Sequence, residues 1–234
     1  MTKQSPTILC LETSTKACSV SLGQNGKILA LKESLDEKYS HAENLTLYIE
    51  EVCRQAKIRL QDIDAVAVSK GPGSFTGLRI GVSTAKGLCY ALDKPLIAIN
   101  SLEAMAAGQI QNSKSKIQNR FCPMIDARRM EVYCAIYDEQ RNEIIKTSAE
   151  IIDENSFSDL FKKNKIYFFG DGAEKCKSKI SHPNAIFIDG VNPSAKFMTP
   201  IAEKYFSKKK FEDVAYFEPF YLKDFVDSKK VITA

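Results

Sequence analysis

The sequence predicts an α/β protein of two tandem lobes, each a mixed sheet flanked by helices. In the first half, hydrophobic periodicity indicates three antiparallel strands followed by a helix, a strand, a second helix and a further strand. A polar stretch at residues 111–119 lacks an apolar face, and beyond it the same pattern starts again. We therefore expect lobes over residues 1–110 and 111–234, with the C-terminal segment able to pack back on the first lobe.

The first half opens with short apolar or alternating runs that are typical of strands. Asn25-Gly26 separates two alternating runs, and this dipeptide favours a hairpin turn. The continuous apolar run Ala65–Val68 is typical of a strand that is covered on both faces. The expected strands are 7–11, 18–22, 28–31, 65–68 and 96–99, and the expected helices are 41–57 and 76–92.

The second half repeats this order. An acidic residue ends the first strand of each half, and Glu12 and Asp126 are 114 positions apart (126 − 12). The same offset carries Val20 to Cys134 and Leu22 to Ile136, and one residue is then skipped before Ile28-Leu29, which predicts that the first pattern starts again. The further expected strands are 121–125, 132–137, 143–145, 166–169 and 185–188, and the further expected helices are 156–163, 173–180 and 195–208.

Composition excludes several classes of protein. Of the 234 residues, 44% are hydrophobic and 26% are charged, as is ordinary for a globular chain. No apolar run approaches the roughly 20 residues of a membrane span, and the N-terminus lacks the apolar core of a signal peptide. The net charge of +4 is too small to indicate nucleic-acid binding. Seven cysteines without a C-x-x-C pair indicate buried free thiols in a reducing cytoplasm.

The glycine-rich segment Gly71–Gly81 has two interpretations. The backbone around Gly71, Gly73 and Ser74 could bind a phosphate group at the start of the following helix. The spacing fits neither a Walker A loop nor G-x-G-x-x-G, and Pro72 removes one N–H group. The alternative is a tight turn, in which Ser74 caps the helix and the glycines allow close packing.

Acidic residues stand at strand ends in both halves. Glu12, followed closely by Ser14, ends the first strand, Asp126 ends its counterpart, and Gly170-Asp171 ends a later strand. Together with the glycine-rich segment, these residues could face one another across a cleft and hold a nucleotide or a metal-bound phosphate. Asp and Gly are equally common as turn formers, so both interpretations stay open.

A metal or hydrolytic site has little support in the sequence. His41 and His182 are the two histidines, and neither belongs to an H-E-x-x-H or H-x-x-x-H pattern. No G-x-S-x-G elbow marks a nucleophilic serine. The run Lys208–Lys210 is typical of a solvated surface, with an RNA contact as the alternative. The residues therefore predict neither a catalytic group nor a metal ligand.

Several segments together resemble the bacterial TsaB (YeaZ) family, and the resemblance covers the whole chain. The most specific are G-P-G-S-F-T-G-L-R-I-G at 71–81 and D-A-R-R-M-E-V-Y at 126–133, whereas the family's usual aspartate after the first strand is Glu12 here. The other segments are Ile8–Ser14, Ser19-Val20, His41–Leu45, Pro95–Ile97, Ser101–Ala106 and Pro219–Leu222.

This resemblance implies a two-lobed fold of the actin/hexokinase/Hsp70 (ribonuclease H-like) type and a role in forming threonylcarbamoyladenosine in tRNA. The family's larger paralogue, TsaD, transfers the threonylcarbamoyl group with a metal held by an H-x-x-x-H pair. The matching positions here are Ser101 and Met105, and serine with methionine is an implausible ligand set for a hard metal. We therefore expect a non-catalytic partner subunit that holds no metal or cofactor of its own.

The resemblance also implies partners. Two helices of the first lobe would pair with TsaD, or with a second copy in a homodimer, and the ATPase TsaE would bind at the junction with TsaD. ATP or ADP would bind only at that junction, tRNA would be met through the complex, and no membrane is involved. A charge at Gly81 or Ala85 should abolish pairing and leave the fold intact. The expected contact residues are Leu47, Tyr48, Gly81, Thr84, Ala85 and Leu88.

Three alternatives stay open. The lobe itself could cover every apolar face of the two helices, which would leave no partner surface. The chain could be an ATP-binding, kinase-like enzyme that uses Glu12, Asp126 and Gly170–Gly172 around the nucleotide. It could also be a metallopeptidase-like (glycoprotease) enzyme of the same superfamily.

Overall fold

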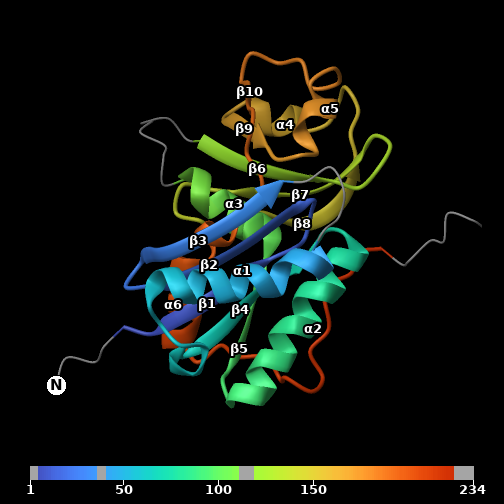
Figure 1. Cartoon of the computed structure of the whole chain (residues 1–234). Coiled ribbons are helices and arrows are strands. Elements are labelled where there is room, and N and C mark those ends of the chain that lie inside the picture. The colour runs from blue at the N-terminus through green and yellow to red at the C-terminus, as the bar shows by residue number, and fades with distance from the viewer. Residues whose placement is uncertain (1–4, 36–40, 111–118, 224–234) are drawn as a thin grey trace, which may run out of the picture.

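The computed structural model describes residues 5–35, 41–110 and 119–223. They form two mixed five-stranded sheets, one above the other in Figure 1. In the first sheet, of order β3-β2-β1-β4-β5, the first three strands of the chain are antiparallel and the last two run parallel to β1. Its strands are β1 (Thr7–Glu12), β2 (Ala17–Gln24), β3 (Lys27–Leu35), β4 (Ala65–Gly71) and β5 (Leu96–Asn100).

The second sheet repeats this plan. Its order, β8-β7-β6-β9-β10, and the directions of its strands match those of the first sheet. Its strands are β6 (Asn119–Asp126), β7 (Glu131–Tyr137), β8 (Glu143–Ile151), β9 (Lys165–Phe169) and β10 (Ala185–Ile188). The predicted fold class, two similar α/β lobes in tandem, is thereby confirmed.

The first hairpins of the two sheets differ in register by one residue. Glu12 lies opposite Ser19, whereas Asp126 lies opposite Val132. A constant offset of 114 would place Tyr133 there (19 + 114 = 133). The constant offset is therefore wrong in β7, because six residues separate the paired Glu12 and Ser19, whereas five separate the paired Asp126 and Val132.

Helices α1 (His41–Ala56) and α2 (Phe75–Leu92) cover one face of the first sheet (Figure 1). In α1, Leu45, Ile49 and Val52 recur at helical spacing and are buried in the core beneath, as the sequence predicted. Between α1 and β4 the chain makes a short 3-10 turn, η1 (Leu60–Asp62).

Helix α3 (Ser101–Ile110) lies between the two sheets. Ala104 and Ala107 join the core on the second face of the first sheet, whereas Leu102, Met105 and Ala106 join a core of the second sheet. A helix that is buried all round cannot show one clean apolar stripe, and the sequence predicted it only through the family resemblance.

The end of the chain returns to the first sheet. A 3-10 turn, η2 (Ala195–Phe197), and helix α6 (Thr199–Ser207) pack through Met198, Ile201 and Ala202 on the face opposite α1 and α2. The predicted helix over 195–208 is therefore interrupted. Pro200 lies in the first turn of α6, where its missing N–H group is tolerated.

A C-terminal strap, residues 211–222, then follows the edge of the first lobe. The Glu212 N–H donates to Leu96 O at 2.9 Å, and the Phe220 N–H donates to Lys70 O at 2.7 Å. Between these points, Lys86 of α2 donates to two backbone carbonyls of the strap, at 3.0 and 3.1 Å. The strap thus fastens the outer side of α2 to the sheet.

The second lobe has two single-turn helices, α4 (Ser158–Phe161) and α5 (Ala173–Cys176), and both are shorter than predicted. The predicted helix over 156–163 begins later than expected, because Phe157 has a φ of 64°, which is not a helical conformation. After α5 the chain continues in tight turns, with the Lys179 N–H donating to Cys176 O.

The structure also bears on the cysteines, on membrane-spanning helices and on the boundary between the lobes. All seven cysteines are free and buried, as predicted. No helix in the described ranges is both long and apolar enough to cross a membrane. The lobe boundary at residue 110 stays a prediction, since 111–118 lie outside the described residues.

Candidate functional site

Strand β1 ends at a buried corner formed by Glu12, Thr13 and Ser14, none of which is accessible to solvent. Glu12 Oε1 accepts a hydrogen bond from the Ser14 N–H at 2.7 Å, while Oε2 has no partner within the described part of the chain. Burial raises the pKa of Glu12 above its ordinary value of 4.5, and the Ser14 and Ser69 hydroxyl groups offset part of this rise. The corner therefore disfavours the charged carboxylate.

The glycine-rich turn closes over this corner. The Ser74 N–H donates to Ser14 O at 2.6 Å, and the Thr13 hydroxyl donates to Gly77 O at 2.8 Å. Ser74 is the N-cap of α2, and its hydroxyl oxygen accepts from the Gly77 N–H at 3.3 Å. Two N–H groups that a phosphate could use are therefore already bonded within the lobe, which favours the tight-turn interpretation.

Three glycines make this close approach possible. A Cβ atom on Gly73 would lie 2.2 Å from Ser14 O. On Gly77 it would lie 2.1 Å from Thr13 O, and on Gly81 it would lie 2.2 Å from Thr13 Oγ1. Helix α2 thus approaches the corner more closely than any side chain at these positions would allow.

Asp126 forms the matching corner at the end of β6. Its carboxylate pairs with the Lys175 ammonium group and accepts a hydrogen bond from the Arg128 N–H at 2.9 Å. The Asp126 N–H donates to Asp171 Oδ1 at 3.1 Å. Lys175 also donates to Glu131 O at 2.7 Å, which fixes the pair against the hairpin. The charge of Asp126 is therefore already balanced within the lobe.

The turn after β9 packs on this second corner. Gly170 has a φ of 110°, in the region that favours glycine. A Cβ atom there would lie 2.1 Å from Met124 O and 2.8 Å from the Met105 methyl group of α3. Gly170 thus lets the turn, the strand and the helix between the lobes meet.

The predicted nucleotide cleft therefore divides into two groups. The first-lobe members lie together, and a Cβ on Gly71 would lie 2.8 Å from Phe220 O of the C-terminal strap. No hydrogen bond or ion pair among the described residues joins this group to the second. The groups are Glu12, Ser14, Gly71, Gly73 and Ser74 in the first lobe, and Asp126, Gly170 and Asp171 in the second.

The two positions that the family resemblance aligned with a metal-ligand pair, Ser101 and Met105, both lie at the buried start of α3. Ser101 and Met105 have no accessible surface, and Met105 joins the apolar core of the second sheet. Serine and a thioether are poor ligands for a hard metal, and apolar burial makes it harder still to hold a charged ion there.

The predicted partner residues fall into two sets. Leu47 of α1 is 59% exposed, and Tyr48, Thr84 and Leu88 are partly exposed. Ala85 is fully buried in the first core, and Gly81 packs against the corner of β1.

The expectation that a charge at Gly81 or Ala85 leaves the fold intact is therefore wrong. The interior offers no room for a side chain at Gly81 and no water for a charge at Ala85. Helical spacing alone could not reveal this, because it does not say which small residues face the lobe's own sheet.

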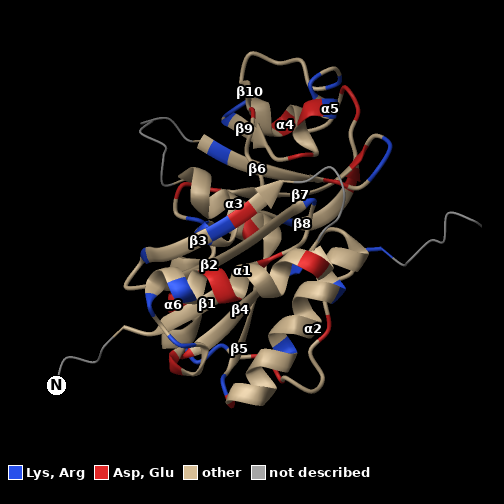
Figure 2. Cartoon of the chain, in the orientation of Figure 1, with Lys and Arg blue, Asp and Glu red and all other residues tan. Residues whose placement is uncertain are grey.

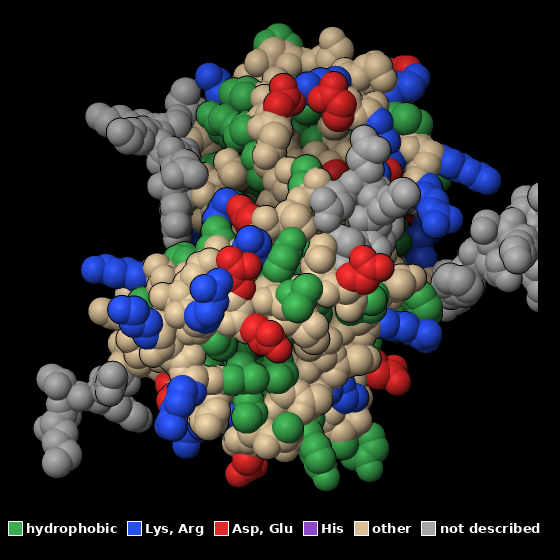
Figure 3. All heavy atoms as spheres, viewed as in Figure 1, with side chains coloured by type: hydrophobic (Ala, Val, Ile, Leu, Met, Phe, Trp, Pro, Cys, Tyr) green, Lys and Arg blue, Asp and Glu red, His purple; other side chains and the backbone are tan. Residues whose placement is uncertain are grey.

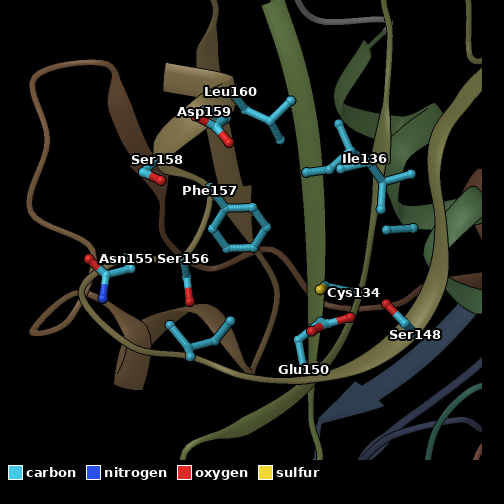
Figure 4. A pocket seen from close by; sticks show the side chains of 13 residues that line it. Cys134, Ile136, Ser148, Glu150, Asn155, Ser156, Phe157, Ser158, Asp159 and Leu160 are labelled. Atoms are coloured by element: carbon cyan, nitrogen blue, oxygen red, sulfur yellow. The ribbon is translucent and has the colours of Figure 1, made fainter. Parts of the chain in front are cut away.

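A cavity of about 330 Å³ lies between β7, β8 and residues 155–160 (Figure 4). Its wall combines apolar side chains, among them Ile136 and Phe157, with Glu150 and Asp159. Sequence reasoning did not find it, since no motif marks residues that come together from two strands and a distant turn.

The close approach of α2 can be tested with two helical glycines. Gly81→Ala is expected to lower the free energy of unfolding by about 1–3 kcal/mol, because the new methyl group would collide with Thr13. Gly87 has nothing within 4 Å of its Cβ position. The matched control Gly87→Ala should therefore raise the free energy by about 0.5–1 kcal/mol. Urea unfolding measures both, and equal effects would contradict the packing.

The buried Glu12 carboxyl predicts a pH dependence of stability. Below pH 4.5 the group is neutral in both states and has no effect. As the pH rises from 4.5 through the raised pKa of the folded state, the unfolded chain ionises first, so the folded state loses stability. Glu12→Gln should therefore be more stable than the wild type, by a difference that grows across this interval and then stays constant in urea titrations.

Glu33 serves as a control for Glu12, because the folded structure lowers its pKa instead of raising it. Burial alone would raise its pKa, but the Ser194 hydroxyl, at 2.5 Å, and Lys196 lower it. This stabilisation is present at neutral pH and is lost as the pH falls through the lowered pKa. Glu33→Gln should therefore be less stable than the wild type at neutral pH and equal to it in acid. Parallel pH profiles for the two variants would contradict the burial argument.

Comparison with known proteins agrees with this picture. Residues 36–224 match the family described as TsaD, tRNA N6-adenosine threonylcarbamoyltransferase. The chain is 31% identical over 230 residues to the tRNA threonylcarbamoyladenosine biosynthesis protein TsaB of Escherichia coli (strain K12), covering 96% of this chain and 97% of that protein. It is 30% identical over 237 residues to the protein of the same name from Haemophilus influenzae, covering 97% and 98%.

Solved structures show the same architecture. "YeaZ from Pseudomonas aeruginosa" has a TM-score of 0.76 at 25% identity and covers 93% of this chain and 100% of that chain. A second structure from that organism, described as similar to peptidase YEAZ, has a TM-score of 0.80 at 24% identity with the same coverage, and it supports the fold alone. Because the sequence matches to named relatives span nearly the whole chain, this chain belongs to the TsaB (YeaZ) family.

Proposed function

We propose that this chain acts in the biosynthesis of threonylcarbamoyladenosine in tRNA, as a non-catalytic subunit that binds and activates TsaD. Its relatives are named for that pathway. The observation that carries the non-catalytic role is the burial of Ser101 and Met105, at the positions that match the metal ligands of TsaD. A subunit that lacks the metal-binding side chains can contribute to the reaction by stabilising its partner's active conformation.

The surface offered to TsaD is the outer side of α1 and α2. It presents Leu47, Tyr48, Thr84 and Leu88, and Figure 3 shows hydrophobic side chains among charged ones on this face of the molecule. Exposed apolar side chains on a helix pair are the kind of surface that a second helix pair covers. We assign the same surface to a homodimer of the free protein, which TsaD would displace, with TsaE at the junction with TsaD.

A nucleotide enters this proposal only at the junction with a partner. In the isolated chain, groups that could bind a phosphate are already engaged, since the Ser74 N–H donates to Ser14 O and the Lys175 ammonium group balances Asp126. ATP or ADP would therefore need further groups from TsaD or TsaE. Calorimetry with Mg-ATP tests the kinase-like alternative, which micromolar binding to the isolated chain, lost in Asp126→Ala, would favour.

The pairing surface predicts a selective loss of partner affinity. Leu47→Glu should weaken binding to purified TsaD by at least about tenfold, or roughly 1.4 kcal/mol, because it would place a charge within the apolar contact. Leu47 is 59% exposed, so the fold should tolerate the change. The matched control is Ile151→Glu, at a residue of the second lobe that is 74% exposed, and it should change the affinity less than about twofold. Co-elution and calorimetry measure both variants.

The activating role predicts a requirement in the reaction itself. Threonylcarbamoyladenosine formation by TsaD should rise when the wild-type chain is added, and Leu47→Glu should need a higher concentration for the same effect, since it acts through binding. Product analysis of tRNA after the reaction provides the measurement. Turnover by the isolated chain, or stoichiometric zinc or iron after purification, would contradict the proposal.

A further inference from the structure

The turn between β6 and β7 holds two arginines in an unfavourable backbone conformation. Arg128 and Arg129 have φ angles of 70° and 50°, in the left-handed region that most side-chain-bearing residues avoid. The β2–β3 hairpin of the first lobe also has two consecutive residues in this region, but they are Asn25 and Gly26, at 56° and 68°. Those two residue types tolerate the conformation. Single residues such as Arg141 and Phe157 also have a positive φ, but Arg128-Arg129 is the one consecutive pair without glycine among the described residues. Because backbone strain concentrates at functional sites, these two side chains are candidates for binding a ligand.

Neither arginine has a counter-charge within the described structure. Both are exposed, and no described carboxylate forms an ion pair with either of them. The two acidic residues that flank the turn are already engaged, since Asp126 pairs with Lys175 and Glu131 pairs with Lys223. The tip of this hairpin is therefore a site of uncompensated positive charge, visible in Figure 2 as the blue loop that follows β6.

The positive charge continues towards the start of α2. Lys223, which pairs with Glu131, follows shortly after Tyr221, whose hydroxyl group accepts a hydrogen bond from Arg79 Nε at 3.3 Å. The Arg79 guanidinium group lies 4.1 Å from the centre of the Phe75 ring, and that ring lies 4.8 Å from the Tyr221 ring. We call this surface the basic edge, and it consists of Arg79, Arg128, Arg129, Lys175 and Lys223.

We propose that the basic edge binds the phosphate backbone of RNA, so that this chain contributes directly to the tRNA-binding surface of the complex. This inference rests on the proposed function, since the relatives' names supply tRNA as the substrate. Guanidinium groups match the oxygen atoms of a phosphate in a bidentate arrangement, which an ammonium group cannot reproduce. The rings of Phe75 and Tyr221 beside Arg79 add flat surfaces of the kind on which unpaired bases stack.

The chain offers a natural competitor for this role. The run Lys208–Lys210 at the end of α6 is also exposed, and α6 lies on the opposite side of the view in Figure 1 from the β6–β7 turn. Lys209 in the middle of that run also has a positive φ, of 52°, and Lys210 lies 4.0 Å from the centre of the Tyr205 ring of α6. Two guanidinium groups without a described ion-pair partner, rather than backbone strain, therefore distinguish the basic edge from this solvated run.

One double variant is expected to change the stability of the fold and the affinity for tRNA in opposite directions. Arg128→Asn with Arg129→Gly removes both guanidinium groups and supplies the residue types that the left-handed backbone favours. The double variant should therefore unfold at a higher urea concentration than the wild type. At the same time it should bind a tRNA transcript at least about tenfold more weakly at low salt. It should also lower the slope of log affinity against log salt by about 1.5–2, for two lost phosphate contacts.

Two control variants are measured beside it by filter binding or fluorescence anisotropy. Lys208→Ala with Lys210→Ala removes the same amount of charge and should change tRNA affinity less than about twofold. Arg128→Lys with Arg129→Lys keeps the charge but loses the bidentate geometry, and it should recover part of the affinity. A larger loss from the lysine run than from the arginine turn would overturn the proposal.

Binding to TsaD distinguishes this inference from the proposed function. The Arg128→Asn/Arg129→Gly variant should co-elute with TsaD as the wild type does, because its two substitutions lie in the β6–β7 turn of the second sheet, whereas Leu47 and Leu88 lie on α1 and α2. If the variant binds both tRNA and TsaD as the wild type does, the RNA inference fails and the proposed role as a partner of TsaD stands. If the variant no longer binds TsaD but binds tRNA with the affinity of the wild type, the turn is a protein contact and the RNA inference is overturned.

Discussion

The absence of side chains along one side of α2 is the constraint on which this structure depends. Gly77 and Gly81 of α2, with Gly73 in the preceding turn, let the helix lie close against Thr13 and Ser14, and this close approach brings Val82 and Ala85 of α2 into the first core. The same approach seals Glu12 away from water. A glycine-rich strand-to-helix turn that resembles a phosphate loop in composition is thus occupied by the protein's own main chain.

Much of the fold could be predicted because its signals are local. The alternation of β2, the Asn25-Gly26 turn and the stripe of α1 each arise within a few residues, and the structure reproduces them. Signals that depend on distant contacts were lost. The interruption before α6 and the all-round burial of α3 are each set by packing between segments that are far apart in the sequence.

The candidate site shows the same division. Residue identity was enough to argue that Ser101 and Met105 make a poor metal site. It could not show that Lys175, 49 residues away, balances Asp126, or that Ala85 faces the lobe's own core. Nor could it show the strain at Arg128 and Arg129, because backbone angles follow from how β6 and β7 are joined. The residue types show which chemistry is available, whereas solvent exposure and the balancing of charges depend on the folded structure.

The return of α6 to the first sheet has a consequence for how the protein is made. Ile8, Cys10 and Ile97 on that face are covered by residues near the end of the chain. On the ribosome, the α6 segment leaves the tunnel roughly 5–20 s after the first lobe, at 5–20 residues per second. Until then this face of the nascent first lobe lacks the apolar cover of Met198, Ile201 and Ala202. This face of the first core is therefore completed late, and a chaperone that shelters that surface would act on this chain during that interval.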